Sequence, residues 1–312
     1  MVEVGVEAGV VVEVVVVVVV GVVVEAVVEV VVGVVVGVEV VVGVEVVVVV
    51  GVVVGVGLMP FSPPFATRER ILNLGPAGSG KTSNFLHIAR FTTLTNTQST
   101  FYIGDSDFAM ERMLPAYPEI HPYVSLHSLY DWEDYTTFGN LVLSQATAND
   151  WVCIDFIGSA WKAVQEFYVQ QVFNRGIGDY FLAARKKEVA ELEGWVDWSV
   201  INPLYQQWIM PLLFKCKAHL FATAKSDPLS PGNKPTEGKD LRAMFLPFSV
   251  KPVGQKDLPF QFHTILVSER DFNGNRLINT VKDRQRPEVR GQLVTDFAID
   301  YLQQVAGWRV TA

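Results

Sequence analysis

The chain has 312 residues, of which 25 are Lys or Arg and 33 are Asp or Glu, and its formal net charge is −8 at pH 7. Seven of the acids lie in residues 1–57, so the rest of the chain has 26 acids against 25 bases. A nearly neutral chain excludes a strong overall positive field, and any contact with nucleic acid has to come from a local basic patch.

Residues 1–57 contain only Met, Val, Glu, Gly and Ala, whereas the sequence from Leu58 onward has an ordinary mixed composition. We therefore expect a low-complexity segment at 1–57 without a functional fold, and one α/β domain at 58–312. Within residues 1–57 the longest run free of Glu and Gly is Val14–Val20, far shorter than the roughly 20 apolar residues that span a bilayer. A basic start typical of signal peptides is missing, so we expect no membrane partner.

Two cysteines, Cys153 and Cys216, stand in apolar surroundings and have no metal-like spacing to His. This pattern favours two reduced thiols in the core. It is typical of a cytoplasmic protein.

Beyond residue 58, short apolar runs alternate with runs in which apolar residues recur three or four positions apart. The apolar runs predict strands at 70–74, 100–104, 123–126, 151–154 and 220–224. The helical runs predict helices at 82–91, 133–148 and 200–217, and one or two helices at 159–193, interrupted at Gly176 and Gly178. Short buried strands that alternate with helices indicate a mostly parallel sheet with helices on both faces.

The C-terminal part follows a different pattern. The run 226–259 is rich in Pro, Gly, Lys and Asp and predicts a long mobile loop. Strand patterns at 262–269 and 277–281 flank the turn signal Asn273-Gly274, which predicts an added β-hairpin at one edge of the sheet. A helix from about 292 to 305 is expected to close the chain.

The segment Gly75–Thr82 reads GPAGSGKT and fits the P-loop pattern G-x-x-x-x-G-K-[ST] between a predicted strand and a predicted helix. Its glycines let backbone N–H groups converge on phosphates, next to the partial positive charge of a helix N-terminus. We expect Lys81 to reach the β- and γ-phosphates and Thr82 to bind Mg²⁺. The cofactors are therefore expected to be ATP and Mg²⁺, and the expected nucleotide-binding residues are Gly75, Pro76, Ala77, Gly78, Ser79, Gly80, Lys81 and Thr82.

Asp155 ends the continuous apolar strand Trp151–Ile154. A carboxylate at the carboxyl end of such a strand lies at the ligand crevice of an open α/β sheet. We therefore expect Asp155 to be the Walker B carboxylate near the metal. The alternative is an Asp that caps the following helix.

With these motifs the chain resembles the RecA-like P-loop ATPases, and among them the phage-encoded AAA/RecA-type ATPases linked to single-strand DNA annealing and recombination. The resemblance spans about 70–286 and rests on GPAGSGKT, FYIGDSD, WVCIDFIGSAW, and HLFATAKSD with the later NTVKDRQRPE. It implies a sheet in which the Walker B strand flanks the P-loop strand. It also implies ATP hydrolysis, action on single-stranded DNA, assembly into a homo-oligomer and, for a phage-encoded chain, a location in the bacterial host cytoplasm.

The resemblance also implies individual roles. A catalytic carboxylate just after the second strand corresponds to Asp107, where the family usually has Glu, and Asp105 competes for that role. A polar sensor after the strand that follows Walker B corresponds to Thr223 or Lys225.

Basic residues at the end of the hairpin, where related ATPases reach a neighbouring subunit's γ-phosphate, correspond to Lys282, Arg284 and Arg286. The alternative is a solvated basic strand end. The 226–259 run, which interleaves Lys residues with Phe245 and Phe248, offers charge and base stacking for a DNA strand, or is an ordinary exposed loop.

Three other functions remain open from the sequence. An AAA-type or packaging motor normally pairs the Walker B Asp with an adjacent Glu, and Phe156 occupies that position. A small-molecule kinase needs an Arg-rich lid, and 226–259 contains only Arg242. A nucleotide-binding module without hydrolysis or DNA activity is the third.

Overall fold

The computed structural model describes residues 68–94, 98–192, 196–230, 238–284, 286 and 293–294, together with the backbone of 2–6 and 10–14. The chain divides into two units, Met1–Pro63 and Pro64–Ala312. In the first unit, strand β1 (Val2–Val6) pairs antiparallel with strand β2 (Val10–Val14). The boundary that we expected near residue 58 lies outside the described residues.

The second unit is an α/β structure built on a mixed, mostly parallel sheet. Among the described residues nine strands take part, in the order β11-β10-β9-β3-β7-β6-β4-β5, and β8 pairs with β7. The run from β9 to β5 is parallel, whereas β8, β10 and β11 are antiparallel to their neighbours. The strands are β3 (Arg70–Gly75), β4 (Phe101–Asp105), β5 (Val124–Ser128), β6 (Trp151–Asp155), β7 (His219–Pro228), β8 (Val250–Pro252), β9 (Thr264–Arg270), β10 (Arg276–Asp283) and β11 (Leu293–Val294).

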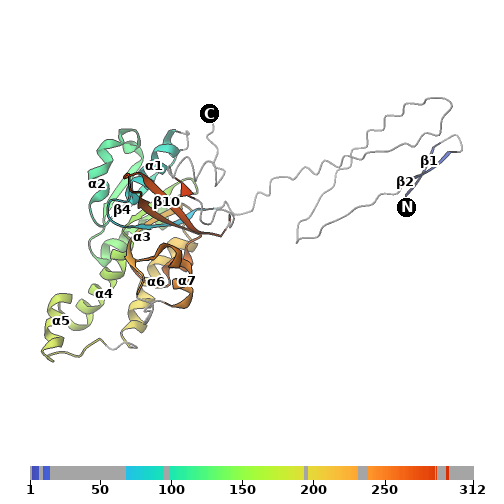
Figure 1. The fold of residues 1–312 in the computed structure, drawn as a ribbon. Coiled ribbons are helices and arrows are strands. Elements are labelled where there is room, and N and C mark those ends of the chain that lie inside the picture. The colour runs from blue at the N-terminus through green and yellow to red at the C-terminus, as the bar shows by residue number, and fades with distance from the viewer. Residues whose placement is uncertain are drawn as a thin grey trace. The chain divides into compact units, whose positions relative to one another are not determined.

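Helices cover both faces of this sheet, as the sequence predicts (Figure 1). The helices are α1 (Lys81–Leu94), α2 (Ala109–Met113), α3 (Trp132–Gln145), α4 (Gly158–Phe173), α5 (Ile177–Arg185), α6 (Trp198–Phe214), α7 (Lys239–Phe245) and α8 (Leu258–Gln261), with 3₁₀ turns η1 (Leu114–Ala116), η2 (Pro118–Tyr123) and η3 (Leu246–Phe248). Trp151 and Cys153 of β6 pack on the face of α1, while Val152 and Ile154 pack on the face of α3, α4 and α6. Successive strand residues point to opposite faces, so a strand buried on both sides is apolar throughout.

The expectation of a long loop at 226–259 is wrong. Strand β7 continues to Pro228 and pairs with β8, helix α7 lies between these two strands in the sequence, and α8 begins at Leu258. Leu241 and Phe245, four residues apart on α7, are buried in the main core. The Pro and Gly content hid this short amphipathic helix, whose stability comes from tertiary packing rather than from local propensity.

Two helix boundaries also differ from expectation. The break in 159–193 falls at Asn174, which takes a left-handed conformation after α4, and at Gly176, which precedes α5, but Gly178 lies inside α5. The closing helix expected from residue 292 is wrong at its start, because Leu293-Val294 form β11 against β10. There the open edge of the hairpin supplies a backbone partner. The rest of 292–305 lies outside the described residues.

The expected neighbour of the P-loop strand is also wrong. Strand β7, and not β6, lies next to β3, so β7 separates β3 from the strand that ends in Asp155. Thr223 of β7 pairs with Asn73 of β3 on one side. On the other side, Ala222, the residue before Thr223, pairs with Ile154, the residue before Asp155. The insertion of β7 therefore brings Thr223 beside Asp155.

At the amino-terminal ends of the parallel strands a buried arginine joins β3 to the end of α6. Arg70 is 1% exposed and donates to the carbonyl oxygens of Leu213, Glu69, Ala218 and Cys216 at 2.6–2.9 Å. Burial lowers the pKa of Arg70 to about 10, against a raising effect of Cys216, so the guanidinium stays charged at neutral pH. The cation satisfies carbonyl groups at a helix C-terminus, which otherwise lack partners.

We expect Arg70→Met to lower the free energy of unfolding by about 3 kcal/mol or more, because it leaves the buried carbonyl oxygens of Leu213 and Ala218 without a donor. Urea denaturation measures this loss. The control Arg112→Met replaces an exposed arginine on α2 and should change stability by less than about 0.5 kcal/mol. Equal stabilities of the two variants would contradict this role of Arg70.

Candidate functional site

The glycine-rich segment Gly75–Thr82 links β3 to α1 at the carboxyl end of the parallel strands. Gly75 has no room for a side chain, since a Cβ atom there would lie 2.2 Å from the carbonyl oxygen of Ser268 on β9. Gly80 has φ of 91°, a conformation that only glycine adopts readily. The segment therefore lies against the β9–β10 hairpin in a form that requires these glycines.

Lys81 and Thr82 begin α1 at the mouth of this segment. The Lys81 ammonium donates to the carbonyl oxygen of Pro76 at 2.8 Å, so it lies over the glycine-rich segment. Burial lowers the pKa of Lys81, and the charges of Asp155 and Asp107 partly oppose that effect. The cation is thus held close to two carboxylates at the start of a helix.

Asp155 is the centre of a hydrogen-bond network at the end of β6. The Thr82 hydroxyl donates to its Oδ2 atom at 3.0 Å, and the Thr223 hydroxyl donates to its Oδ1 atom. The carboxyl is 1% exposed, and this burial, together with the charges of Asp107 and Asp105, raises its pKa to about 6 despite the two hydroxyl donors. The structure thus connects α1, β6 and β7 through one buried acid.

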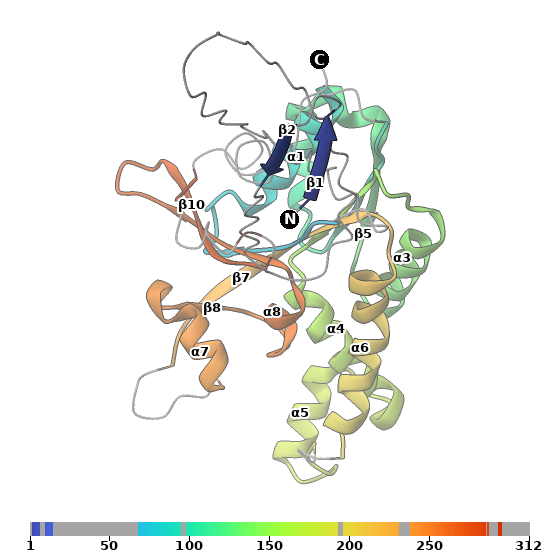
Figure 2. The same cartoon turned by 90° about the vertical axis from the view of Figure 1, so that its right-hand side faces the viewer.

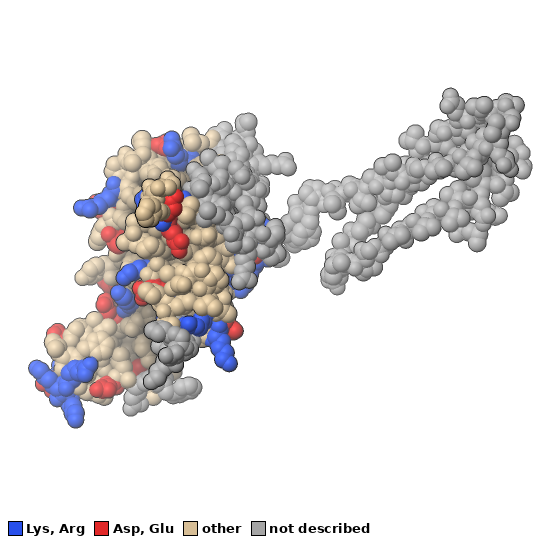
Figure 3. All heavy atoms as spheres, viewed as in Figure 1, with Lys and Arg blue, Asp and Glu red and all other residues tan. Residues whose placement is uncertain are grey.

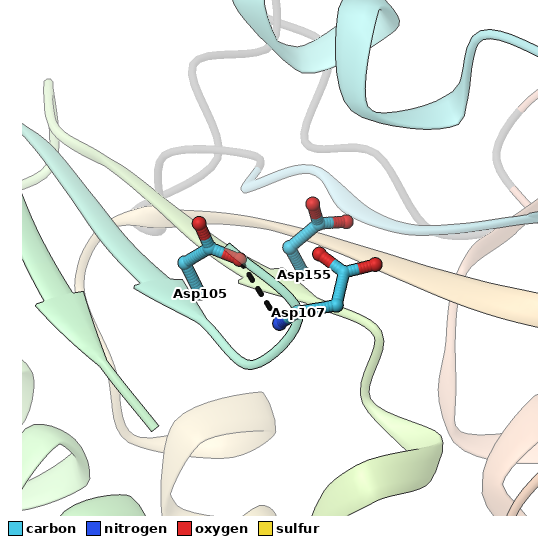
Figure 4. A group of neighbouring side chains, drawn as sticks. All are labelled: Asp105, Asp107 and Asp155. Carbon is cyan, nitrogen blue, oxygen red and sulfur yellow. Dashed lines mark hydrogen bonds between the residues drawn. The ribbon is translucent and has the colours of Figure 1, made fainter. Parts of the chain in front are cut away.

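Three carboxylates point toward one another at this end of the sheet (Figure 4). Asp105, Asp107 and Asp155 each offer an oxygen atom, and these atoms lie within 4.8 Å of one another. Carboxylate oxygens are the ligands that Mg²⁺ prefers, and Mg²⁺ also keeps waters and phosphate oxygens in its shell. The three carboxylates therefore form a donor set that a divalent cation such as Mg²⁺ would fit.

Asp105 and Asp107 differ in what they bind. Asp105 is buried and accepts hydrogen bonds from the backbone N–H groups of Asp107 at 3.2 Å and Met110 at 2.9 Å, which ties the end of β4 to the start of α2. Asp107 is exposed and accepts from the N–H of Ala109 at 3.1 Å. Partial burial raises the pKa of Asp107, with the Ala109 hydrogen bond opposing and Asp105 adding to the rise. These contacts assign a structural role to Asp105 and leave Asp107 available at the pocket.

The two carboxylates that line the pocket, Asp107 and Asp155, are each followed by a phenylalanine with a left-handed backbone. Phe108 has φ of 58° and Phe156 has φ of 59°, values that are unfavourable for a bulky side chain. Such conformations cost about 1–3 kcal/mol each and concentrate at functional sites. The Phe156 N–H donates to the Thr223 hydroxyl at 2.7 Å, so the network around Asp155 stabilises its turn.

The pocket in front of these groups has a volume of about 480 Å³. Asp107, Asp155, Thr82 and Thr223 line it together with Gly78 and Gly80. Its charged side chains are four cations and two carboxylates: Lys81, Lys225, Arg270, Arg276, Asp107 and Asp155. An excess of positively charged side chains beside a carboxylate cluster that could hold a cation suits a polyphosphate ligand.

Sequence reasoning missed Arg270 and Arg276. They face each other as the paired residues nearest the hairpin turn, and β9 lies next to β3, so both arginines lie beside the glycine-rich segment. Arg270 Nε donates to the carbonyl oxygen of Gly78 at 2.7 Å. The Asn273-Gly274 turn signals the pairing of the two arginines, but the proximity of β9 to β3 is not visible in the sequence.

The three basic residues expected near a γ-phosphate lie away from this pocket. They lie at and just after the end of β10, at the amino-terminal ends of the parallel strands. Asp283 of β10 pairs with Thr264, which pairs with Ile71 near the start of β3. The Lys282 ammonium donates to the carbonyl oxygens of Phe262 and Pro259, and burial, with Arg284 adding, lowers its pKa to about 8. Arg284 donates to the carbonyl of Phe260, and Arg286 pairs with Glu69 and Asp283. The residues that line the pocket do not include these three, and a role toward a neighbouring subunit stays a prediction.

The two sensor candidates both lie at the pocket. Thr223 holds Asp155, as described above, and Lys225 lies at the register position opposite Gly75. The structure thus brings together Lys81, Thr82, Asp107, Asp155, Thr223 and Lys225 and separates them from Lys282, Arg284 and Arg286.

Comparison with models of protein families and with curated proteins gave no match for this chain. The family resemblance therefore rests on the motifs of this chain alone. Among the described helices, none combines the length and hydropathy needed to cross a bilayer.

In the absence of divalent ions we expect Asp155→Asn to raise the free energy of unfolding at pH 8 by up to about 3 kcal/mol. The pKa of Asp155 is about 6 in the folded protein against an ordinary 3.8, so the folded state binds this proton more tightly than the unfolded state. Stability therefore falls as pH rises from about 4 to about 6, and the whole loss is present above that range.

Urea denaturation at pH 8 and pH 4 in chelator-treated buffer measures this difference, and the gain should vanish at pH 4. The control Glu191→Gln removes an exposed acid and should leave stability nearly unchanged. A metal-free Asp155→Asn protein less stable than wild type at pH 8 would contradict the inference that this carboxylate is destabilised by burial.

Proposed function

We propose that the chain binds ATP with Mg²⁺ in the 480 Å³ pocket and hydrolyses it. One observation carries the proposal: a glycine-rich segment, a lysine, a hydroxyl bonded to a buried carboxylate and a second, exposed carboxylate meet at one edge of the sheet. Each group has a role in phosphoryl transfer, in which positioning and electrostatic stabilisation do most of the work.

In this proposal the N–H groups of Gly75–Thr82 and the N-terminus of α1 bind the phosphates. Lys81 moves from the Pro76 carbonyl to a phosphate oxygen. Thr82 and Asp155 hold Mg²⁺, which neutralises charge on the β- and γ-phosphates when bound. Thr223 keeps Asp155 in place, and Asp107 orients the water that attacks the γ-phosphate.

The choice of Asp107 for this last role follows from the hydrogen bonds. Phe156, the residue after Asp155, has an apolar ring and cannot orient water. Asp105 is committed to backbone N–H groups. Asp107 lines the pocket and remains exposed, so water can reach it.

The resemblance stated above supports single-stranded DNA as a partner and a homo-oligomer as the active form. The aromatic contribution needs revision, because Phe245 is buried and Phe248 packs against the core. Phe272 at the tip of the β9–β10 hairpin is fully exposed instead and is available for base stacking. In Figure 2 this hairpin projects clear of the helices.

Charge over the surface gives a weaker indication of where DNA would lie. On the face shown in Figure 3 basic and acidic side chains are interspersed, and a group of basic side chains lies at the end where Figure 1 places α5. The exposed residues of that helix end include Arg185, Lys186 and Lys187. Phosphate release with and without a poly(dT) oligonucleotide tests whether DNA acts on the ATPase site.

We expect Lys81→Ala to reduce Mg²⁺-dependent phosphate release from ATP by about 100-fold or more, because it removes a cation that stabilises transferred charge. A steady-state phosphate assay measures this, with the exposed Lys186→Ala as the matched control. Lys81→Ala protein with unchanged turnover would overturn the proposed function.

We expect Asp107→Asn to bind ATP as wild type does and to hydrolyse it at least about 100-fold more slowly, because orienting water matters for turnover and not for binding. Calorimetric titration and single-turnover hydrolysis separate the two quantities. Asp105→Asn should instead lower the melting temperature, because its carboxylate accepts from the backbone at the start of α2. Active Asp107→Asn with inactive, stable Asp105→Asn would move the role to Asp105.

A further inference from the structure

Arg276, the first residue of β10, lies against the glycine-rich segment without a bound partner. A Cβ atom placed on Gly80 would lie 3.0 Å from its Cδ and Nε atoms and 3.3 Å from Cζ, so its guanidinium borders the residue that precedes Lys81. The side chain is half-buried and lines the pocket. Among the described residues none accepts a hydrogen bond from it or forms an ion pair with it.

Its neighbour Arg270 is bonded on two sides. Arg270 Nε donates to the Gly78 carbonyl at 2.7 Å, and its Nη1 atom donates to the Gly274 carbonyl at 2.6 Å. These bonds join the glycine-rich segment to the turn of the hairpin. Arg270 is therefore a positioning residue, and two of its five N–H donors are used by the protein itself.

The two arginines are direct cross-strand partners. Paired residues of an antiparallel ladder lie on the same face a few ångströms apart, and like charges there are destabilising. An anion between or beside them would remove that penalty. The arrangement is therefore unfavourable without ligand and favourable with a phosphate in the pocket.

We propose that Arg276 binds the phosphate chain of the nucleotide held by its own chain, while Arg270 holds the Gly78 carbonyl of the glycine-rich segment in place. The inference rests on the proposed ATP site. A guanidinium has a planar fork of donors that matches phosphate oxygens, which suits it to complete the set begun by Lys81. In this arrangement the site has an arginine contact from its own chain, in addition to any basic residue that a neighbouring subunit supplies.

Titration calorimetry of Mg·ATP and Mg·ADP into the full-length protein tests the contact. We expect Arg276→Ala to raise the Kd of both nucleotides about tenfold or more, the usual effect of losing a hydrogen bond to a charged group. Arg276→Lys keeps the charge without the fork and should recover part of the affinity. Arg175→Ala, at an exposed position after α4, is the control and should bind as wild type.

A second readout separates ligand binding from a structural role. Nucleotide-free Arg276→Ala should melt at or above the wild-type temperature, because the substitution removes a like-charge pair, whereas loss of a structural arginine would lower that temperature. A mixture of Arg276→Ala and Lys81→Ala proteins should show no more hydrolysis than the sum of its parts, because both groups belong to one pocket.

The outcomes distinguish this inference from the proposed function. If wild type binds no nucleotide, both fail. If wild type binds ATP and Arg276→Ala binds it equally well, only the role of Arg276 is overturned. Restored hydrolysis in the mixture would assign Arg276 to the pocket of a neighbouring subunit.

Discussion

The position of strand β7 between β3 and β6 is the constraint on which the site depends. It places Thr223 where one hydroxyl accepts from the Phe156 N–H and donates to Asp155. Asp155 in turn accepts from Thr82 at the start of α1. Three elements that are far apart in the sequence are thereby joined through a single buried acid.

Several features of the pocket are unfavourable in the absence of ligand. Asp155 is buried as an acid beside two other carboxylates, two phenylalanines take left-handed conformations, and two arginines pair across the hairpin. A cation would relieve the cost at the carboxylates, and a phosphate would relieve the cost at the arginines. A ligand that binds only the folded state also stabilises that state in proportion to its affinity and concentration. These local costs are what we would expect of a site that binds an anion and a cation together, as we propose for this pocket.

Most elements could be predicted from sequence because their signals are local. The buried strand Trp151–Asp155, the GPAGSGKT segment and the Asn273-Gly274 turn all depend on neighbours within a few residues. The prediction was wrong where Pro and Gly obscured packing, as in α7, and where pairing with a distant strand decided the conformation, as in Leu293-Val294. Local propensity competes there with contacts that no short window contains.

The sequence by itself determined the candidate loop, the carboxylates at two strand ends and the alternation that makes an α/β sheet. Residues adjacent along the chain carry that information. Only the tertiary structure decided the strand order, the commitment of Asp105 to the backbone, the remoteness of Lys282, and the presence of Arg270 and Arg276 beside Gly78 and Gly80. These depend on which strands become neighbours, and strand neighbours are set by the burial of two whole sheet faces rather than by any local pattern.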